Sequence, residues 1–399
     1  TRLLFAISAA GFTAASFMCG LTSTIEQMIL WRAVQGFLGA GMIPTVFASA
    51  YTIFPRSKMP MVTPIIGLVA TLAPTVGPTV GGYITDVMSW HWLFFINIVP
   101  GIGITIGVWM LVDFDKPNFK LLENFDWWGL ASMAGFLGAL EYVLEEGPQY
   151  DWFQDPSVFW LGIVCAFSAF VFFWRVLRVK EPIVDIRAFT DRNFALGSMF
   201  SFCVGIGLYG LTYIYPRYLA EVRGYSALMI GETMFVSGIA MFATAPLVGK
   251  LMTKVDLRYL IAAGLIIFAI GSWQMTWITR DYDFYELLWP QVFRGVGMML
   301  AMVPVNNIAL GTLPPDRLKN ASGLFNLTRN LGGAVGLAII NTVLDHRTDL
   351  HISRLHDRVT WGNAMAVETL NMLTQKFQGA GNASLMAMKQ LRPSLSWQT

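Results

Sequence analysis

An arginine stands inside a long apolar stretch, in the segment Trp31-Arg-Ala-Val-Gln-Gly36. A charged residue at the centre of a membrane helix costs roughly 2.5–3.5 kcal/mol on insertion scales, so Arg32 is expected to face a partner or a wet cavity. A cation there favours the deprotonated form of a nearby carboxylate, and this would link proton release to substrate arrival. The alternative is a structural arginine that backbone carbonyls satisfy. We favour the coupling role.

A second apolar stretch carries glycine and proline where a membrane helix is usually smooth. Glycine lets helix backbones approach closely, and proline leaves backbone groups that a neighbouring helix must satisfy. The run therefore predicts a helix that packs tightly and bends. It is either a gate or a plain packing element, and we favour the gate. The residues of this run that we single out are Ala73, Gly77, Pro78, Gly81 and Gly82.

Polar and aromatic side chains within other apolar stretches are candidates for a substrate path. Buried polar groups in membrane spans usually face the interior of the bundle. Asn326, Arg329 and Asn330 share one helical face through their i, i+3, i+4 spacing. Each candidate taken alone is better explained as a hydrogen-bonding residue between helices, and the two charged ones are the strongest. The full set is Tyr209, Tyr213, Glu232, Asn306, Asn307, Asn326, Arg329 and Asn330.

A short charged turn between two later stretches contains Gly249, Asp256 and Arg258. Such turns can hold one conformation through ion pairs and helix-end dipoles. A conformational latch and an ordinary solvated loop are equally good interpretations here.

Other sequence motifs for chemistry are absent or lack the surrounding structure that they require. The run Gly205-Ile-Gly-Leu-Tyr-Gly210 fits a dinucleotide pattern, but it lies inside an apolar span without a preceding strand. The chain has no phosphate-binding loop with the Gly-Lys-Ser/Thr ending, and its three cysteines are scattered. His346, His351 and His356 lie close together in the polar tail, where a solvated loop is a better interpretation than a weak metal site. We therefore expect no enzyme, no cofactor, no metal site and no nucleic-acid partner.

The composition is that of an integral membrane protein. Apolar residues make up 55% of the chain and charged residues only 13%, against about 25% charge in soluble domains. Stretches of about 20 mostly apolar residues can cross a bilayer as helices. The sequence predicts an all-α fold with eleven of them, near 3–21, 26–52, 61–84, 92–112, 127–144, 158–178, 194–219, 226–252, 259–279, 286–311 and 321–343.

Lysine and arginine are distributed very unequally between alternate loops. One set of loops holds fifteen of them and the opposite set of short loops holds three. Because cytoplasmic loops carry the excess of positive charge, the N-terminal edge is predicted to be cytoplasmic and the C-terminal tail to lie outside.

A weak internal repeat relates the second and tenth spans. Leu30-Trp-Arg-Ala-Val-Gln-Gly36 matches Leu288-Trp-Pro-Gln-Val-Phe-Arg-Gly295, and each segment runs on to a proline, Pro44 and Pro304. Repeated halves are typical of secondary transporters. The offset of eight spans leaves two extra spans between the halves.

These motifs together resemble a known family. The glycine run, Trp31–Gly36, Trp92-Leu-Phe-Phe-Ile-Asn97, Pro182-Ile-Val-Asp185 and 313–329 are similar to the fourteen-helix drug:proton antiporters of the major facilitator superfamily, the EmrB/QacA group. The resemblance covers nearly the whole chain, with an alanine, Ala73, where the antiporter signature has glycine. On the family plan the chain would lack helices 1, 2 and 14. Residues 1–112 would be helices 3–6, residues 113–193 two linker helices and a loop, residues 194–343 helices 9–13, and residues 344–399 an external loop.

The resemblance also implies a function. It implies proton-coupled efflux of amphipathic drugs across a bacterial inner membrane, with Arg32, Gln35 and Gly36 in proton coupling and the glycine run as the antiporter gate. For EmrB-type permeases it further implies a periplasmic membrane-fusion adaptor (EmrA-type) and an outer-membrane channel as partners. A same-fold transporter of another solute, such as a metabolite or siderophore exporter, and a non-transporting receptor or scaffold remain open alternatives.

Overall fold

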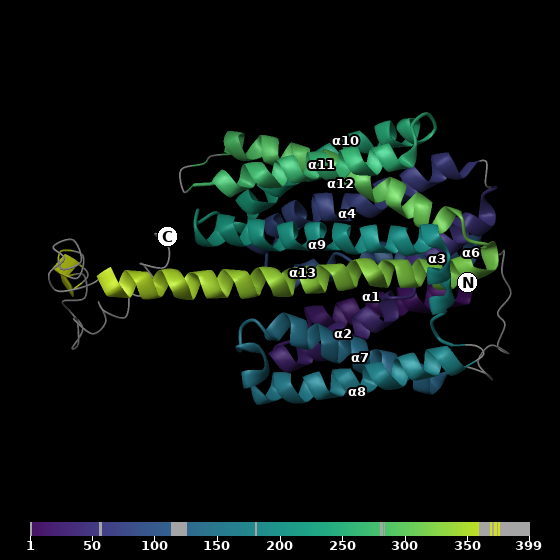
Figure 1. Cartoon of the computed structure of the whole chain (residues 1–399), viewed down its shortest axis with the longest axis horizontal. Coiled ribbons are helices and arrows are strands. Elements are labelled where there is room, and N and C mark those ends of the chain that lie inside the picture. The colour runs from purple at the N-terminus through teal and green to yellow at the C-terminus, as the bar shows by residue number, and fades with distance from the viewer. Residues whose placement is uncertain are drawn as a thin grey trace. The chain divides into compact units, whose positions relative to one another are not determined.

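The computed structural model describes residues 2–55, 58–112, 126–179, 182–279, 282, 284–358 and five positions between 368 and 375. All regular structure in these residues is helical, which confirms the predicted fold class. Figure 1 labels most of the helices. In chain order they are α1 (Arg2–Gly20), α2 (Ile25–Gly39), α3 (Met42–Ile53), α4 (Met59–Val87), α5 (Trp92–Phe95), α6 (Ile98–Leu111), α7 (Trp127–Glu146), α8 (Pro156–Arg178), α9 (Arg192–Glu221), α10 (Ala227–Met252), α11 (Leu257–Gln274), α12 (Phe284–Gly311) and α13 (Pro315–Arg358).

Every predicted span contains a helix. Within the described residues, eight helical segments are long and apolar enough to cross a membrane: α1, α5 with α6, α8, α9, α10, α11 with its last short turn, α12 and part of α13. The remaining three predicted spans correspond to α2 with α3, to α4 and to α7. The total of eleven crossings stays a prediction.

Two predicted boundaries differ from the structure. The expected span 26–52 is interrupted at Ala40 and Gly41, although both residues keep helical dihedral angles. The proline at position 44, in the first turn of α3, has no N–H with which to bond the carbonyl four residues before it. The last span was expected to end at 343, but α13 continues to Arg358. Residues 344–358 lack glycine and proline, so the helix continues after its apolar character ends.

The chain divides into two compact units. One comprises Thr1–Phe136 with Phe167–Gly333, and the other comprises Leu137–Ala166 with Ala334–Thr399. All the contacts discussed below lie within the first unit. The division at residues 112, 193 and 343 expected from the family plan stays a prediction.

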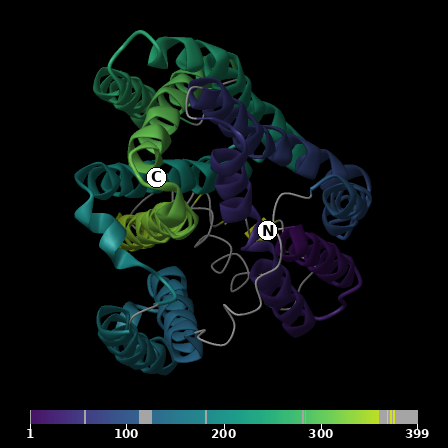
Figure 2. The same ribbon diagram turned by 90° about the vertical axis from the view of Figure 1, so that its right-hand side faces the viewer.

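Helix α12 is the central helix of the first unit. Two thirds of its most apolar window (67%) is buried, a larger share than in any other candidate span of the described residues. It contacts α9, α10 and α11, and Figures 1 and 2 show these helices packed side by side. Close approach to α11 depends on Gly264, where a Cβ atom would lie 2.6 Å from the backbone nitrogen of Ala301. A polar side chain on α12 is therefore held in the interior of the unit.

The start of α7 is tied to the end of α8 by a buried ion pair. Nη2 of Arg175 donates to Oδ1 of Asp126 at 2.6 Å, and the Asp126 side chain is only 1% exposed. The same oxygen accepts from the backbone N–H of Gly129 and so caps the first turn of α7. One carboxylate thus fixes both helices.

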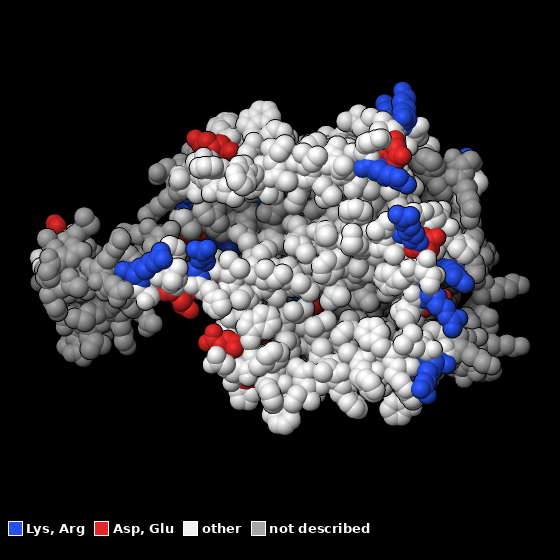
Figure 3. All heavy atoms as spheres, viewed as in Figure 1, with Lys and Arg blue, Asp and Glu red and all other residues white. Residues whose placement is uncertain are grey.

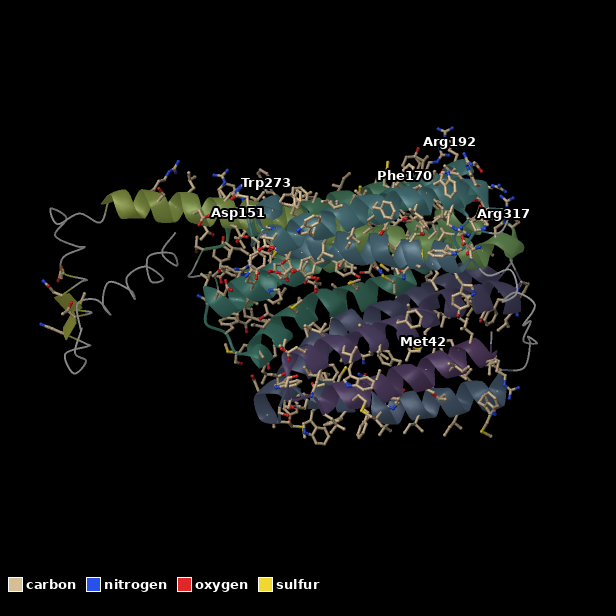
Figure 4. All side chains as sticks on the ribbon, turned by 90° about the horizontal axis from the view of Figure 1, so that it is seen from below. Met42, Asp151, Phe170, Arg192, Trp273 and Arg317 are labelled. Atoms are coloured by element: carbon tan, nitrogen blue, oxygen red, sulfur yellow. The ribbon has the colours of Figure 1, made fainter. Side chains whose placement is uncertain are left out.

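The outer surface of the first unit is apolar between polar ends. On the face drawn in Figure 3 the middle is almost free of charged side chains, and most of the visible Lys and Arg lie at the right-hand end, with a few at the left. Figure 4 shows Arg192 and Arg317, both from loops predicted to be cytoplasmic, at the same end, with Trp273 at the other. Phe170 lies between and is 70% exposed. This pattern suits helices surrounded by lipid.

Candidate functional site

Arg32 and Gln35 contact each other on α2. Nη1 of Arg32 donates to Oε1 of Gln35 at 3.2 Å, and the guanidinium lies 4.7 Å from the ring centre of Phe94. Arg32 is exposed, and in the described part of the chain no carboxylate forms an ion pair with it. The third residue of the predicted motif, Gly36, has open space around it, with no atom within 4 Å of a Cβ built there.

The matching position of the internal repeat holds a second pair of the same type. On α12, Nη1 of Arg294 donates to Oε1 of Gln291, again at 3.2 Å. The order along the chain is reversed, since arginine precedes glutamine on α2 and follows it on α12. Here both residues are buried, with 7% and 1% of their surfaces exposed. Neither Gln291 nor Arg294 was among the predicted site residues, although the repeat and the rarity of charge within a span both pointed to Arg294.

A cavity of about 50 Å³ lies beside this second pair. It is lined by residues of α9, α10, α11 and α12, and its walls include Met234, Met241, Phe268 and Met298 as well as the pair itself. Apolar walls with a small number of polar groups are typical of sites for small organic ligands. Methionine side chains adapt to ligands of different shape because they are unbranched and flexible.

The arginine is held in place on the side of α9 and α11. Its guanidinium lies 5.7 Å from the ring centre of Tyr215, and Nη1 also donates weakly to the sulfur of Met275 at 3.4 Å. Nε of Arg294 has no hydrogen-bond partner among the residues described, whereas the side chain of Gln291 is also hydrogen-bonded to the hydroxyl of Tyr215. The site therefore presents a cation with a free N–H donor.

Four of the predicted substrate-path residues meet between α9 and α13 in two pairs. The hydroxyl of Tyr209 donates to Oδ1 of Asn330 at 3.2 Å. On α13 itself, Nη2 of Arg329 donates to Oδ1 of Asn326 at 2.8 Å, and Arg329 is 9% exposed. These contacts agree with the shared helical face expected for Asn326, Arg329 and Asn330, and their part in transport stays a prediction.

The other predicted path residues lie apart from the cavity. Tyr213 accepts a hydrogen bond from Nη1 of Arg217, and Asn306 is buried on α12 beside the half-buried Asn307. Glu232 is exposed on α10 and is not a wall of the cavity.

The glycine-rich helix α4 packs directly against α10. A Cβ atom at Gly82 would overlap the carbonyl oxygen of Ala227, and one at Gly231 would lie 2.6 Å from Cα of Thr79 and 2.7 Å from the carbonyl oxygen of Pro78. By contrast, no atom lies within 4 Å of a Cβ at Gly77, and Gly81 has only an ordinary contact. The side chain of Ala73 lies outside the described residues. The tight contact therefore uses the C-terminal part of the predicted gate.

Two hydrogen bonds reinforce this crossing. The hydroxyl of Thr79 donates to the carbonyl of Gly231 at 2.7 Å. One carboxylate oxygen of Asp86, at the end of α4, accepts from the backbone N–H of Leu228 in the first turn of α10 at 3.0 Å. An acidic side chain at a helix N-terminus satisfies a free N–H group and complements the helix dipole.

The predicted cytoplasmic latch has a local role that the structure makes plain. Asp256 caps α11, because its carboxylate accepts from the backbone N–H of Arg258 at 2.9 Å. The side chains of Asp256 and Arg258 are both exposed, and Gly249 lies near the end of α10. A latch function is a separate prediction.

Comparison with known proteins identifies the group to which this architecture is similar. The family model described as Major Facilitator Superfamily matches residues 1–337. The chain is 38% identical to "Colistin resistance protein EmrB" of Acinetobacter baumannii, over 100% of this chain and 78% of that protein. It is 31% identical to "Fatty acid resistance protein FarB" of Neisseria gonorrhoeae, over 94% of this chain and 73% of that protein. It is 30% identical to "Multidrug export protein EmrB" of Escherichia coli, over 94% of this chain and 75% of that protein.

Proposed function

Because this chain belongs to the major facilitator superfamily, we propose that it is a membrane transporter that exports amphipathic small molecules in exchange for protons. The observation that carries the proposal is the cavity between α9, α10, α11 and α12, with adaptable apolar walls and a buried cation. The names of its relatives refer to multidrug export and to resistance to colistin and fatty acids. Amphipathic compounds suit such a site because the polar part of the ligand can contact the buried cation while its apolar part contacts the apolar walls.

Alternating access supplies the mechanism. In transporters built from repeats, one half rocks against the other around a central site. Helices α4 and α10 belong to the two predicted halves, and they contact each other through Gly82, Thr79 and Gly231. In the proposed mechanism this contact closes one side of the transporter. Export would require this contact to separate so that the cavity opens outward.

Proton movement supplies the energy. We assign coupling to Arg32, which has one hydrogen bond to Gln35 and a cation that is free to attract a carboxylate. Binding of a proton to that carboxylate would release the arginine, and the conformational equilibrium would shift with the differential affinity of the two states for the proton.

The charge distribution and the relatives support a location and partners for the protein. The excess of basic residues in one set of loops favours an N-terminal edge in the cytoplasm of a bacterial cell and a C-terminal tail outside the inner membrane. A periplasmic adaptor of the membrane-fusion class and an outer-membrane channel would then carry the compound onward, with the external tail as the contact surface.

An accumulation assay in cells tests this proposal. The full-length protein is expressed in an efflux-deficient host, and the uptake of fluorescent amphipathic compounds is followed with and without a protonophore. We expect energised extrusion by the wild type and its loss in Arg32→Ala at equal membrane abundance. Normal extrusion by Arg32→Ala would reduce Arg32 to a structural role. No extrusion by an abundant wild type would favour a transporter of another solute or a non-transporting receptor.

A further inference from the structure

The buried cation on α12 has no counterion of its own. Arg294 is 7% exposed, and its contacts in the described chain are an amide oxygen, a thioether sulfur and an aromatic ring. No carboxylate among the described residues forms an ion pair with it. A charge removed from water without a partner is costly, so buried charges are normally paired. The unpaired arginine is thus unexplained by the packing of the protein alone.

One further atom of this arginine also lacks a partner. Nε of Arg294 is buried and donates to nothing in the described chain, whereas the side chain of Gln291 is also hydrogen-bonded to the hydroxyl of Tyr215. Nε carries a hydrogen, so it needs an acceptor rather than a donor. The planar guanidinium also has the geometry that matches a carboxylate through two parallel hydrogen bonds. The missing partner is therefore an acceptor with negative charge.

The space next to this donor is lined mostly by apolar side chains. Both Gln291 and Arg294 line the cavity, which has methionine and phenylalanine side chains on its other walls. An inorganic anion would leave those walls without contact. A molecule with an acidic group at one end and an apolar body fits both parts.

The other charged residues on the predicted substrate path do not offer this chemistry. Glu232 is an anion and is exposed away from the cavity. Arg329 already donates to Asn326 at 2.8 Å, and it is not part of the cavity wall.

We propose that Arg294 and Gln291 form the recognition site for the carboxylate of an amphipathic organic anion, whose apolar body lies against Met234, Met241, Phe268 and Met298. This inference rests on the proposed export function and specifies its substrate class. Discrimination arises because an amide in place of the carboxylate leaves the arginine without a counterion. Hydrogen bonds to a charged group are stronger than neutral ones, so we expect a preference of about tenfold to a hundredfold.

Binding to the full-length protein in lipid nanodiscs tests the assignment without requiring transport. The probe is tritiated 2-naphthoate, with empty nanodiscs as the blank. The competitors are 2-naphthamide and (2-naphthylmethyl)ammonium, which keep the ring and change only the head group. We expect naphthoate to bind the wild type about tenfold to a hundredfold more tightly than either competitor. Equal affinity for the three compounds in the wild type would overturn the proposal, and this comparison needs no variant.

Variants locate the site. Arg294→Met should abolish the preference for naphthoate while leaving naphthamide binding unchanged, and Arg294→Lys should keep part of it because the charge remains without the planar fork. The matched control is Arg217→Met, since Arg217 is a half-buried arginine of α9, outside the cavity wall, that is paired with Glu221 at 3.1 Å. An anion preference that survives Arg294→Met and disappears in Arg329→Met would contradict the assignment.

The outcome is separable from that of the export proposal. Extrusion of neutral or cationic compounds without any preference for naphthoate would refute the anion site and leave the export function standing. A preference that depends on Arg294, in a protein that extrudes nothing, would support the site and refute the export function.

Discussion

The contact between α4 and α10 makes a quantitative prediction for Gly231→Ala. A Cβ atom at this position lies 2.6 Å from Cα of Thr79, whereas ordinary van der Waals contact begins near 3.4 Å. Because the nearest atoms belong to the backbone, the two helices have to separate by about 0.8 Å to admit the methyl group. The same movement lengthens the Thr79–Gly231 hydrogen bond from 2.7 Å to about 3.5 Å, where its energy is largely lost.

The expected energy follows from these distances. Loss of one hydrogen bond costs about 0.5–1.5 kcal/mol, and loosened packing along the crossing adds a similar amount. The conformation with this contact closed should therefore lose about 1–3 kcal/mol relative to the open one, which corresponds to a shift of about 5- to 150-fold in their equilibrium. An open conformation populated at about 1% in the wild type would then be populated enough to detect.

Spin labels measure this shift directly. Labels are placed at Tyr83 on α4 and Met229 on α10, which are 54% and 44% exposed, after the native cysteines are replaced by alanine. Pulsed electron–electron distance measurement on the full-length protein in nanodiscs then gives the populations. We expect Gly231→Ala to increase the long-distance population. The matched control is Gly107→Ala on α6, because no atom lies within 4 Å of a Cβ at Gly107.

An unchanged distance distribution in well-folded Gly231→Ala would refute this reasoning. It would mean that the two backbones are not in contact in the populated state, and that the glycine has another purpose. An equal shift in Gly107→Ala would show that any added methyl group perturbs the protein, so the effect would not be specific to the crossing.

Three further predictions follow from the contacts of the first unit. Gly77→Ala should leave the distances between α4 and α10 unchanged in the same experiment, since its surroundings are open; a shift would place the contact further along the helix. Asp126→Asn should destabilise the protein by about 3–5 kcal/mol, because Arg175 loses the negative charge of its buried partner. The measurement is the midpoint of thermal unfolding in detergent, which should fall; an unchanged midpoint would show that the pair is exposed to water. Asp86→Asn should weaken the cap on Leu228 by about 0.3–1 kcal/mol and raise the open population slightly, and a lower open population would contradict it.

Much of the fold could be predicted from apolar length alone. Each predicted span contains a helix because about 20 apolar residues satisfy their backbone groups in a bilayer only by forming one. Boundaries were harder, since hydropathy marks where the apolar surface ends and not where the helix ends. The continuation of α13 to Arg358 shows this, as does the interruption near Gly41, which depends on hydrogen bonds local to the proline at 44.

The candidate site was only partly predictable. Glycine and charge in apolar stretches pointed to Gly82 and Arg32, and the structure places Gly82 in a tight crossing. Which face of a membrane helix is buried is hard to predict, because both faces are apolar; Glu232 was expected on the substrate path and is exposed. The pair Gln291 and Arg294 was missed, although the repeat and the charge within an apolar span both pointed to Arg294. Their burial depends on the central place of α12, which only the packing of its neighbours reveals.

Proton movement driven by substrate is the most direct test of the export account. The full-length protein is reconstituted into vesicles that contain a pH-sensitive dye, and a substrate found in the cellular assay is added outside at zero membrane potential. The account predicts that protons leave the vesicle as substrate enters, that the exchange requires both, and that Arg32→Ala abolishes the proton flux at equal reconstitution. Substrate uptake by the wild type without any proton flux would contradict proton-coupled antiport.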